Sequence, residues 1–234
     1  MKTLTVGSNA ISRPAAARQS LVRKALFACG VVSSVLYVAA TVVAGQRWKG
    51  YSPVHQAVSE LSAVGAPSRP LMVPLMLTYS ALATAFGLGV WKSAGRKRSV
   101  RVSGALITGY GIASMTGPFT PMHLRGGERT LTDKLHLIGT GVDVLFIFLS
   151  TGFGANALGK RFRNYSIGTI VFLLGFGTYL GIKLPRIVKN VDADVPTPWA
   201  GVNERFLIFS YLLWVGALSV GLLRSQPESL EDEG

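Results

Sequence analysis

The segment from Gly117 to Ser150 reads GPFTPMHLRGGERTLTDKLHLIGTGVDVLFIFLS and decides how the rest of the chain is interpreted. It begins at a Gly-Pro break, passes through a charged loop and ends in an apolar run long enough for a membrane helix. Polar groups at membrane depth are costly and usually face a cavity or a partner helix. Steps of three and four residues from Asp133 trace one helical stripe, made of His136, Thr140, Asp143, Ile147, Ser150 and Gly154.

The composition excludes an ordinary soluble domain. Of the 234 residues, 49% are hydrophobic and only 15% are charged, and several apolar runs reach about 20 residues, the length that crosses a hydrocarbon core. The net charge of +13 does not indicate nucleic-acid binding, because the basic residues lie in short loops and no helix-turn-helix or aromatic-basic pattern accompanies them. The single cysteine, Cys29, leaves no intrachain disulfide and no thiolate metal site.

The apolar pattern predicts an all-α, polytopic integral membrane protein that forms a bundle of six transmembrane helices. The membrane domain is expected to occupy residues 25–223, between a disordered basic tail (1–24) and an acidic tail (224–234). The N-terminal segment, rich in Arg and Ser and free of acid, also fits an organellar transit peptide. The expected spans are residues 25–45, 71–91, 102–122, 134–158, 165–184 and 206–223.

The distribution of basic residues predicts the orientation of these spans. Clusters around Arg96 and at Lys160–Arg163 fall on the same side as the N-terminus, whereas the basic residues of the other loops are diluted by acidic ones. Since positive loops stay inside, both termini are predicted to be cytoplasmic in a multi-pass protein of the cell membrane. The connections 46–70, 118–133 and 185–205 then lie outside, the first with a short amphipathic helix near His55 and Glu60.

This topology places the notable polar residues at the outer side of the bundle. Asp143 lies about 14 Å into its helix at 1.5 Å per residue, with no Lys or Arg at comparable depth. Its carboxyl group must therefore be protonated, hydrogen-bonded to hydroxyl groups or reached by water; Tyr79, Tyr110 and Tyr179 are the mid-span candidates. The preferred hypothesis is a non-enzymatic protein with an outer pocket for a lipid or small ligand, lined by Glu60, His136, Thr140, Asp143, Glu204 and Arg205.

Two alternatives remain open at this point. His55, His123 and His136, with Asp143 or Glu60 as base, have the ligand types of a zinc hydrolase acting on a lipid-like substrate, although no HxxxH or HExxH pair joins them. A small transporter is the second alternative, for which the break at Gly117-Pro118 is one indication. The preferred hypothesis involves membrane lipids as partners and no cofactor, and assigns no catalytic residue. Small residues such as Gly177 and Gly181 leave a homo-oligomer open.

Several short motifs resemble the bacterial membrane family catalogued as domain of unknown function 998. The resemblance covers about Leu26 to Leu223, and it implies a six-span architecture with the shared residues clustered at the outer side. The family is itself distantly similar to the DRAM-like six-span proteins. The motifs are Tyr51-Ser52, His55, Val58-Ser59-Glu60-Leu61 and Gly65-Ala66-Pro67 in the first outer loop, Gly117-Pro118-Phe119, His136, and Gly201-Val202-Asn203-Glu204-Arg205.

Overall fold

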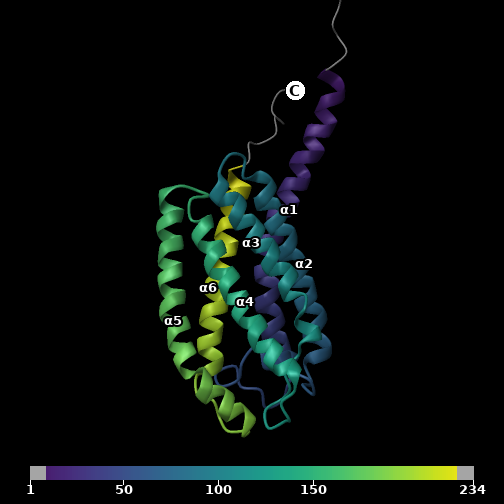
Figure 1. The fold of residues 1–234 in the computed structure, drawn as a ribbon. Coiled ribbons are helices and arrows are strands. Elements are labelled where there is room, and N and C mark those ends of the chain that lie inside the picture. The colour runs from purple at the N-terminus through teal and green to yellow at the C-terminus, as the bar shows by residue number, and fades with distance from the viewer. Residues whose placement is uncertain (1–8, 226–234) are drawn as a thin grey trace, which may run out of the picture.

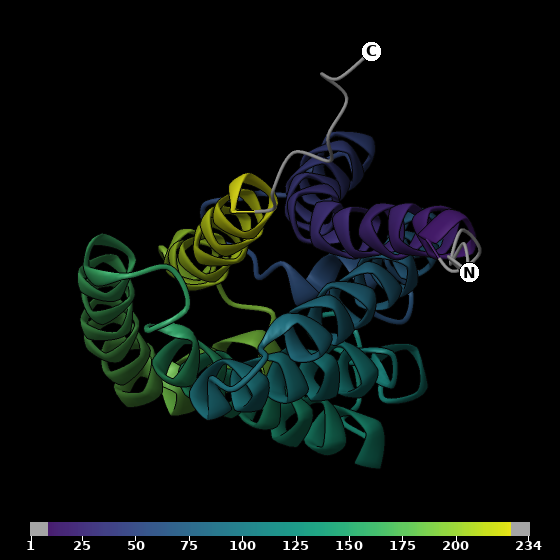
Figure 2. The ribbon, with the colours of Figure 1, turned by 90° about the horizontal axis from the view of Figure 1, so that it is seen from above.

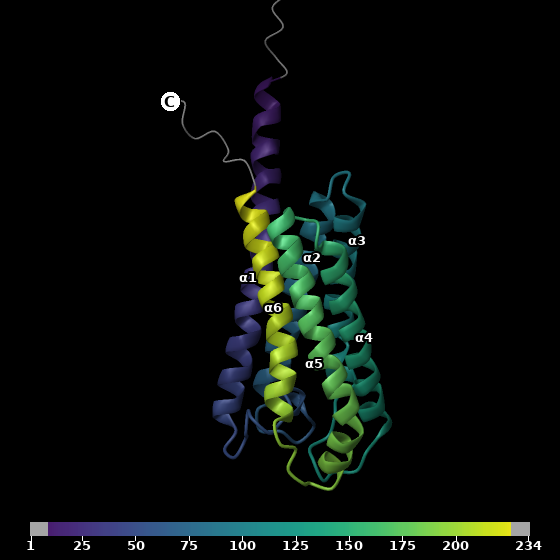
Figure 3. The ribbon, with the colours of Figure 1, turned by 90° about the vertical axis from the view of Figure 1, so that its left-hand side faces the viewer.

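The computed structural model describes residues 9–225, and in this part of the chain six long helices lie side by side (Figures 1 and 3). No strand occurs in this range, where the only β-pairing is an isolated bridge between Val64 and His123. Two short 3-10 helices, η1 (Ser59–Ser62) and η2 (Gly117–Phe119), lie in connections. The long helices are α1 (Asn9–Arg47), α2 (Arg69–Ser93), α3 (Arg98–Ser114), α4 (Leu131–Gly154), α5 (Lys160–Asp192) and α6 (Ala200–Arg224).

Five of these helices are long and apolar enough to cross a membrane, namely α1, α2, α4, α5 and α6. Their outward-facing side chains are apolar as well: Ile138 of α4 is 63% exposed, Val171 of α5 is 64% exposed and Leu213 of α6 is 68% exposed. Large apolar groups exposed along helices of this length are expected where lipid is the solvent. The chain is therefore an all-α protein with several membrane-spanning helices.

Helix boundaries differ from the predicted ones at three places. The tail predicted to be disordered is helical from Asn9, and this part of α1 extends beyond the bundle (Figure 1). Helix α3 ends at Ser114 instead of continuing to residue 122, because Gly117 and Pro118 form η2. Helix α5 continues through Pro185 to Asp192, where the sequence predicted a loop. Residues 1–8 and 226–234, which include most of the predicted acidic tail, lie outside the described residues.

The two ends of the bundle differ in charge. The end that carries the short connections 94–97 and 155–159 has many Lys and Arg side chains and, among the described residues, no acidic one; we call it the basic end. The opposite end carries the connections 48–68, 115–130 and 193–199, and we call it the capped end. Apart from Asp143, all Asp and Glu residues in the described part of the chain lie at the capped end.

Glycines bring α2 and α3 into backbone contact. A Cβ atom added at Gly104 would lie 2.4 Å from the backbone nitrogen of Trp91, and one added at Gly87 would lie 2.4 Å from that of Thr108. In a membrane no hydrophobic effect drives helices together, so they associate through van der Waals contact, which this close approach increases. Helix α4 joins this pair through Ser103, whose hydroxyl donates a 2.8 Å hydrogen bond to the carbonyl oxygen of Ser150.

Toward the basic end, Trp214 closes the space between α4, α5 and α6. Its side chain is fully buried, and its indole nitrogen donates a 2.9 Å hydrogen bond to Ser166 of α5. Gly154 of α4 leaves no room for a Cβ, which would lie 2.8 Å from the indole ring. Seen along the bundle, α5 occupies one corner beside α6 (Figure 2). The three helices are therefore packed together in this half of the bundle.

At the capped end, one buried ion pair joins all three connections. Arg125 of the second connection donates two hydrogen bonds, of 2.8 and 2.9 Å, to the carboxylate of Glu60 in the first connection. Glu60 is only 1% exposed. Arg125 also donates to Thr197 and to the carbonyl of Val195 in the third connection. The hydrogen bond with Glu60 raises the pKa of the Arg125 guanidinium, so the arginine stays charged. Bidentate pairs of this kind combine strength with fixed geometry.

Replacing Arg125 by alanine is expected to loosen the capped end strongly. The Arg125→Ala variant leaves a buried Glu60 carboxylate without its counter-charge, which costs about 3–5 kcal/mol of stability. The matched control is Arg129→Ala, which removes ion pairs with the exposed Asp192 and with Asp133. Because Asp133 keeps its hydrogen bonds from Thr130 and His123, this variant should cost only about 1 kcal/mol. Thermal unfolding of the detergent-purified proteins measures both, and equal losses would contradict the central role of the Glu60–Arg125 pair.

Candidate functional site

The position of α4 is fixed at the capped end by Asp133. Its carboxylate accepts hydrogen bonds from the backbone nitrogen of Thr130 at 2.9 Å and completes a capping box with that residue. The same carboxylate accepts from the backbone nitrogen of His123 at 2.7 Å, lies 2.8 Å from the ring Nδ1 of His123 and pairs with Arg129 at 3.2 Å. With all these partners, Asp133 holds the second connection against the start of α4 and is not free to bind a ligand.

The polar stripe that the sequence predicted on α4 faces the interior of the bundle at its two ends. It is buried at both ends, at Asp133 near the cap and at Ser150 and Gly154 near Trp214. Between these ends Thr140 is exposed, and His136 and Asp143 are half-buried. The inner face of α4 is therefore covered by protein at both ends and accessible in the middle.

Asp143 has no charged partner in the described part of the chain. Its two carboxylate oxygens each lie 3.5 Å from the hydroxyl of Ser114 in α3, the longest separation at which a hydrogen bond is counted. Tyr110 lies four residues before Ser114 in α3, and so on the same side of that helix. A carboxyl group in the middle of a spanning helix with one weak contact has unused capacity to accept hydrogen bonds.

His136 has one committed ring nitrogen and one free one. Its Nδ1 lies 3.2 Å from the carbonyl oxygen of Thr120. A carbonyl only accepts, so Nδ1 carries the proton, and in the neutral imidazole Nε2 is then an acceptor. Nε2 has no partner among the described residues. Thr140 donates its hydroxyl hydrogen to the carbonyl of His136 at 3.0 Å and keeps its oxygen lone pairs.

The other predicted pocket residues have structural partners in the cap. Glu60 is bound to Arg125, as described above. Glu204 accepts a 2.6 Å hydrogen bond from the backbone nitrogen of Val58 and so holds the segment before η1. Arg205 donates to the carbonyl of Pro53 at 2.8 Å and to the hydroxyl of Tyr51 at 2.7 Å. These contacts separate Glu60, Glu204 and Arg205 in role from the stripe on α4.

Tyr51 completes the contacts of Arg205. Its hydroxyl donates to the carbonyl of Ala57 at 2.9 Å while it accepts from Arg205. Burial raises the pKa of Tyr51, which keeps the donated proton in place at ordinary pH. The tyrosine and the arginine together tie the first connection to the start of α6.

The three histidines do not meet in one site. His123 is bound to Asp133, His136 to Thr120, and the Nδ1 of His55 accepts a 3.3 Å hydrogen bond from the backbone nitrogen of Trp199. Within residues covered by the structure, no group of three or more His, Cys, Asp or Glu side chains could hold a metal ion. The ligand set that a zinc hydrolase would need is therefore not assembled from His55, His123 and His136.

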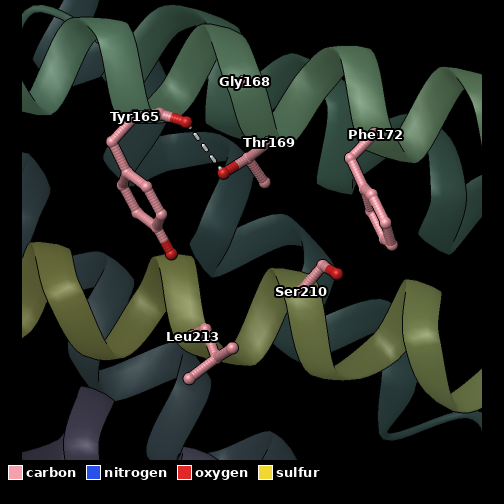
Figure 4. A pocket seen from close by; sticks show the side chains of 6 residues that line it. All are labelled: Tyr165, Gly168, Thr169, Phe172, Ser210 and Leu213. Atoms are coloured by element: carbon pink, nitrogen blue, oxygen red, sulfur yellow. Dashed lines mark hydrogen bonds between the residues drawn. The ribbon is translucent and has the colours of Figure 1, made fainter.

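A shallow groove of about 300 Å³ lies between α5 and α6, away from the stripe (Figure 4). Its hydroxyl groups are used within their own helices: Thr169 donates to the carbonyl of Tyr165 at 3.0 Å, and Ser210 donates to that of Phe206 at 2.6 Å. The groove thus offers mainly apolar surface and little polar recognition. Its lining residues are Tyr165, Gly168, Thr169, Phe172, Ser210 and Leu213.

Some residues around the site could not be identified from the sequence. Tyr79 and Tyr110 were expected near Asp143, and their hydroxyls lie 2.9 Å apart in the core, but Tyr179 is 48% exposed and faces outward. Tyr37 and Tyr211 were not expected and continue this cluster, with ring centroids 4.9 Å from Tyr79 and 5.5 Å from Tyr110, respectively. Only the pairing of the helices in space reveals them.

Comparison with known proteins identifies the family and no activity. The family described as "Protein of unknown function (DUF998)" matches residues 31–221, which include α2, α3, α4 and α5 whole, most of α6 and the C-terminal part of α1. No curated protein and no solved structure matches the chain. The match confirms the resemblance seen in the sequence motifs, and the chain belongs to the DUF998 family of proteins of unknown function.

Proposed function

We propose that this protein is a ligand-binding protein of the cell membrane, and that its ligand, a lipid or a small polar molecule, binds the exposed middle of the α4 stripe at His136, Thr140 and Asp143. One observation carries the proposal: Asp143 is the only Asp, Glu, Lys or Arg side chain in the middle of a described spanning helix, and Ser114, 3.5 Å away, is its single hydrogen-bond partner among the described residues. An intramembrane carboxylate is costly to keep and is therefore usually functional.

The proposed topology has six spans with both termini in the cytoplasm. Helix α3 has 17 residues, about 26 Å at 1.5 Å per residue, which is at the lower limit for a span. Its close glycine contacts with α2 support a position inside the bundle beside the other spans. The charge of the basic end supports a cytoplasmic location for it under the positive-inside rule. The capped end is then extracytoplasmic.

The Asp143→Asn variant is expected to bind its ligand about tenfold more weakly or worse, because a hydrogen bond to a charged acceptor is lost. The same change removes a charge from membrane depth, so the melting temperature should stay constant or rise. Mass spectrometry of molecules retained by the detergent-purified protein measures binding. Asp192→Asn, which alters an exposed carboxylate at the capped end, is the matched control. A large fall in melting temperature with unchanged retention would make Asp143 a structural residue.

The topology is tested by labelling single cysteines on either side of α3. In a Cys29→Ala background, Lys97→Cys and Glu128→Cys place thiols at exposed positions of the basic and capped ends. A membrane-impermeant maleimide applied to intact cells should label Glu128→Cys at once and Lys97→Cys only after permeabilisation. Labelling of both positions from the same side would show that α3 does not cross the membrane.

A further inference from the structure

The groove between α5 and α6 opens to the outside of the bundle, at a depth where lipid is the solvent. Leu213 in its wall is 68% exposed. The rings of Tyr165 and Phe172 point from α5 toward α6 at the two ends of the groove, and Gly168 lies between them (Figure 4). Its volume of about 300 Å³ is at the small end of the range for ligand pockets. The groove therefore fits part of one apolar chain and not a whole ligand.

The wall of the groove that α5 forms continues to the basic end as an arginine. Arg161 lies four residues before Tyr165 and seven residues before Gly168. These spacings are about one and two turns of an α-helix, so Arg161 is on the same side of α5 as the groove. Its side chain is exposed and lies roughly 6 Å nearer the basic end than Tyr165, at 1.5 Å per residue.

The wall that α6 forms also continues to an arginine. Arg224 is exposed and lies eleven residues, or about three turns, after Leu213, so it is on the groove side of α6. The hydrogen bond between Trp214 and Ser166 fixes the relative level of the two helices. From this contact, Arg161 lies five residues along α5 and Arg224 ten residues along α6, about 8 and 15 Å toward the basic end. Both walls of the groove therefore end in an arginine at the basic end.

These two arginines have no counter-charge in the described part of the chain. Neither guanidinium has a hydrogen-bond or ion-pair partner among the described residues, and none of the described Asp and Glu residues lies at the basic end. Guanidinium groups match the geometry of phosphate and bind it bidentately. The ends of spanning helices lie at the level of the lipid head groups. An anionic phosphate head group therefore complements Arg161 and Arg224 in charge and in position.

We infer that the α5–α6 groove and the two arginines beyond it form one binding site for an anionic phospholipid of the leaflet at the basic end. One acyl chain lies in the groove against Gly168 and Leu213, and Arg161 and Arg224 bind the phosphate. The apolar groove accepts the chain of any lipid, so the arginines supply the selectivity for negative charge. The site lies away from the α4 stripe and does not depend on the proposed function.

The position of the arginines distinguishes this site from a general attraction of basic residues to the membrane surface. Basic residues at one end of a bundle orient a membrane protein by their number, whichever side of a helix they occupy. Arg163 is exposed, has no side-chain partner among the described residues and lies two residues after Arg161, so it points away from the groove. Arg163→Gln is therefore the matched control for Arg161→Gln and Arg224→Gln.

The head-group assignment is tested with phosphatidylglycerol and phosphatidylcholine that have identical acyl chains. Each lipid is titrated into the detergent-purified protein, and bound lipid is counted by native mass spectrometry. Wild type should bind phosphatidylglycerol in preference, and Arg161→Gln and Arg224→Gln should each weaken its binding about fivefold. Binding of phosphatidylcholine should not change, and Arg163→Gln should behave as wild type. Equal losses in all three variants, or no preference in wild type, would overturn the site.

The part of the groove is tested by filling it. Gly168→Phe places a ring where no heavy atom lies within 4 Å of an added Cβ, so the variant should fold. It should weaken phosphatidylglycerol binding about fivefold or more, because a displaced chain draws the head group away from the arginines. Gly175→Phe is the matched control, since Gly175 is equally free of neighbours and lies on the same side of α5 but nearer the capped end, beyond Phe172.

Two results with these variants would contradict the inference. Full binding in Gly168→Phe, together with losses in the arginine variants, would show that the groove is not part of the site. The same mass spectra report the number of chains. A dimer that Gly168→Phe separates and Gly175→Phe leaves intact would show that a second copy, and not a lipid, covers the groove.

Discussion

The buried ion pair between Glu60 and Arg125 is the interaction on which the capped end depends. Three connections that are far apart in sequence meet at this pair, and none has regular secondary structure of its own beyond a single 3-10 turn in each of the first two. Desolvating both charges is costly, and the cost is offset by the bidentate geometry and by further hydrogen bonds from Gln56 and the backbone nitrogen of Ala57 to Glu60. This pair allows loops to form a closed cover over a helical bundle.

The inner face of α4 carries residues that stabilise the fold and other residues that are available to bind a ligand. At the capped end Asp133 is saturated with hydrogen bonds, and near the basic end Ser150 and Gly154 pack against α3 and Trp214. In between, His136, Thr140 and Asp143 keep free acceptor capacity. Polar groups whose hydrogen bonds are all made within the chain stabilise the fold, whereas groups left partly unsatisfied at membrane depth are where binding is expected. The same stripe therefore contains both kinds of residue, separated by about two helical turns.

The helical class, the approximate spans and the α4 stripe could be predicted because each depends on local periodicity and on apolar length. Glu60, Glu204 and Arg205 were expected to line the pocket, since the sequence shows their side of the membrane but not their partners. Arg125, which neutralises Glu60, lies 65 residues away from it in a loop without a distinctive pattern. The continuation of α5 through Pro185 was also missed: a proline normally ends or bends a helix, and here α5 bends while its last turns are held by Arg129 and Gly126 (Figure 1).

The accessibility of position 140 tests the central claim most directly, namely that the α4 stripe is closed to water and open to lipid. A nitroxide label is attached to Thr140→Cys in a Cys29→Ala background, the protein is placed in lipid nanodiscs, and relaxation by oxygen is compared with relaxation by a water-soluble nickel chelate. Oxygen concentrates in the hydrocarbon region, so a closed cap above an exposed Thr140 predicts strong relaxation by oxygen and little by the chelate. Strong relaxation by the chelate would mean that the cap admits water, and no relaxation by either would mean that position 140 is covered by protein.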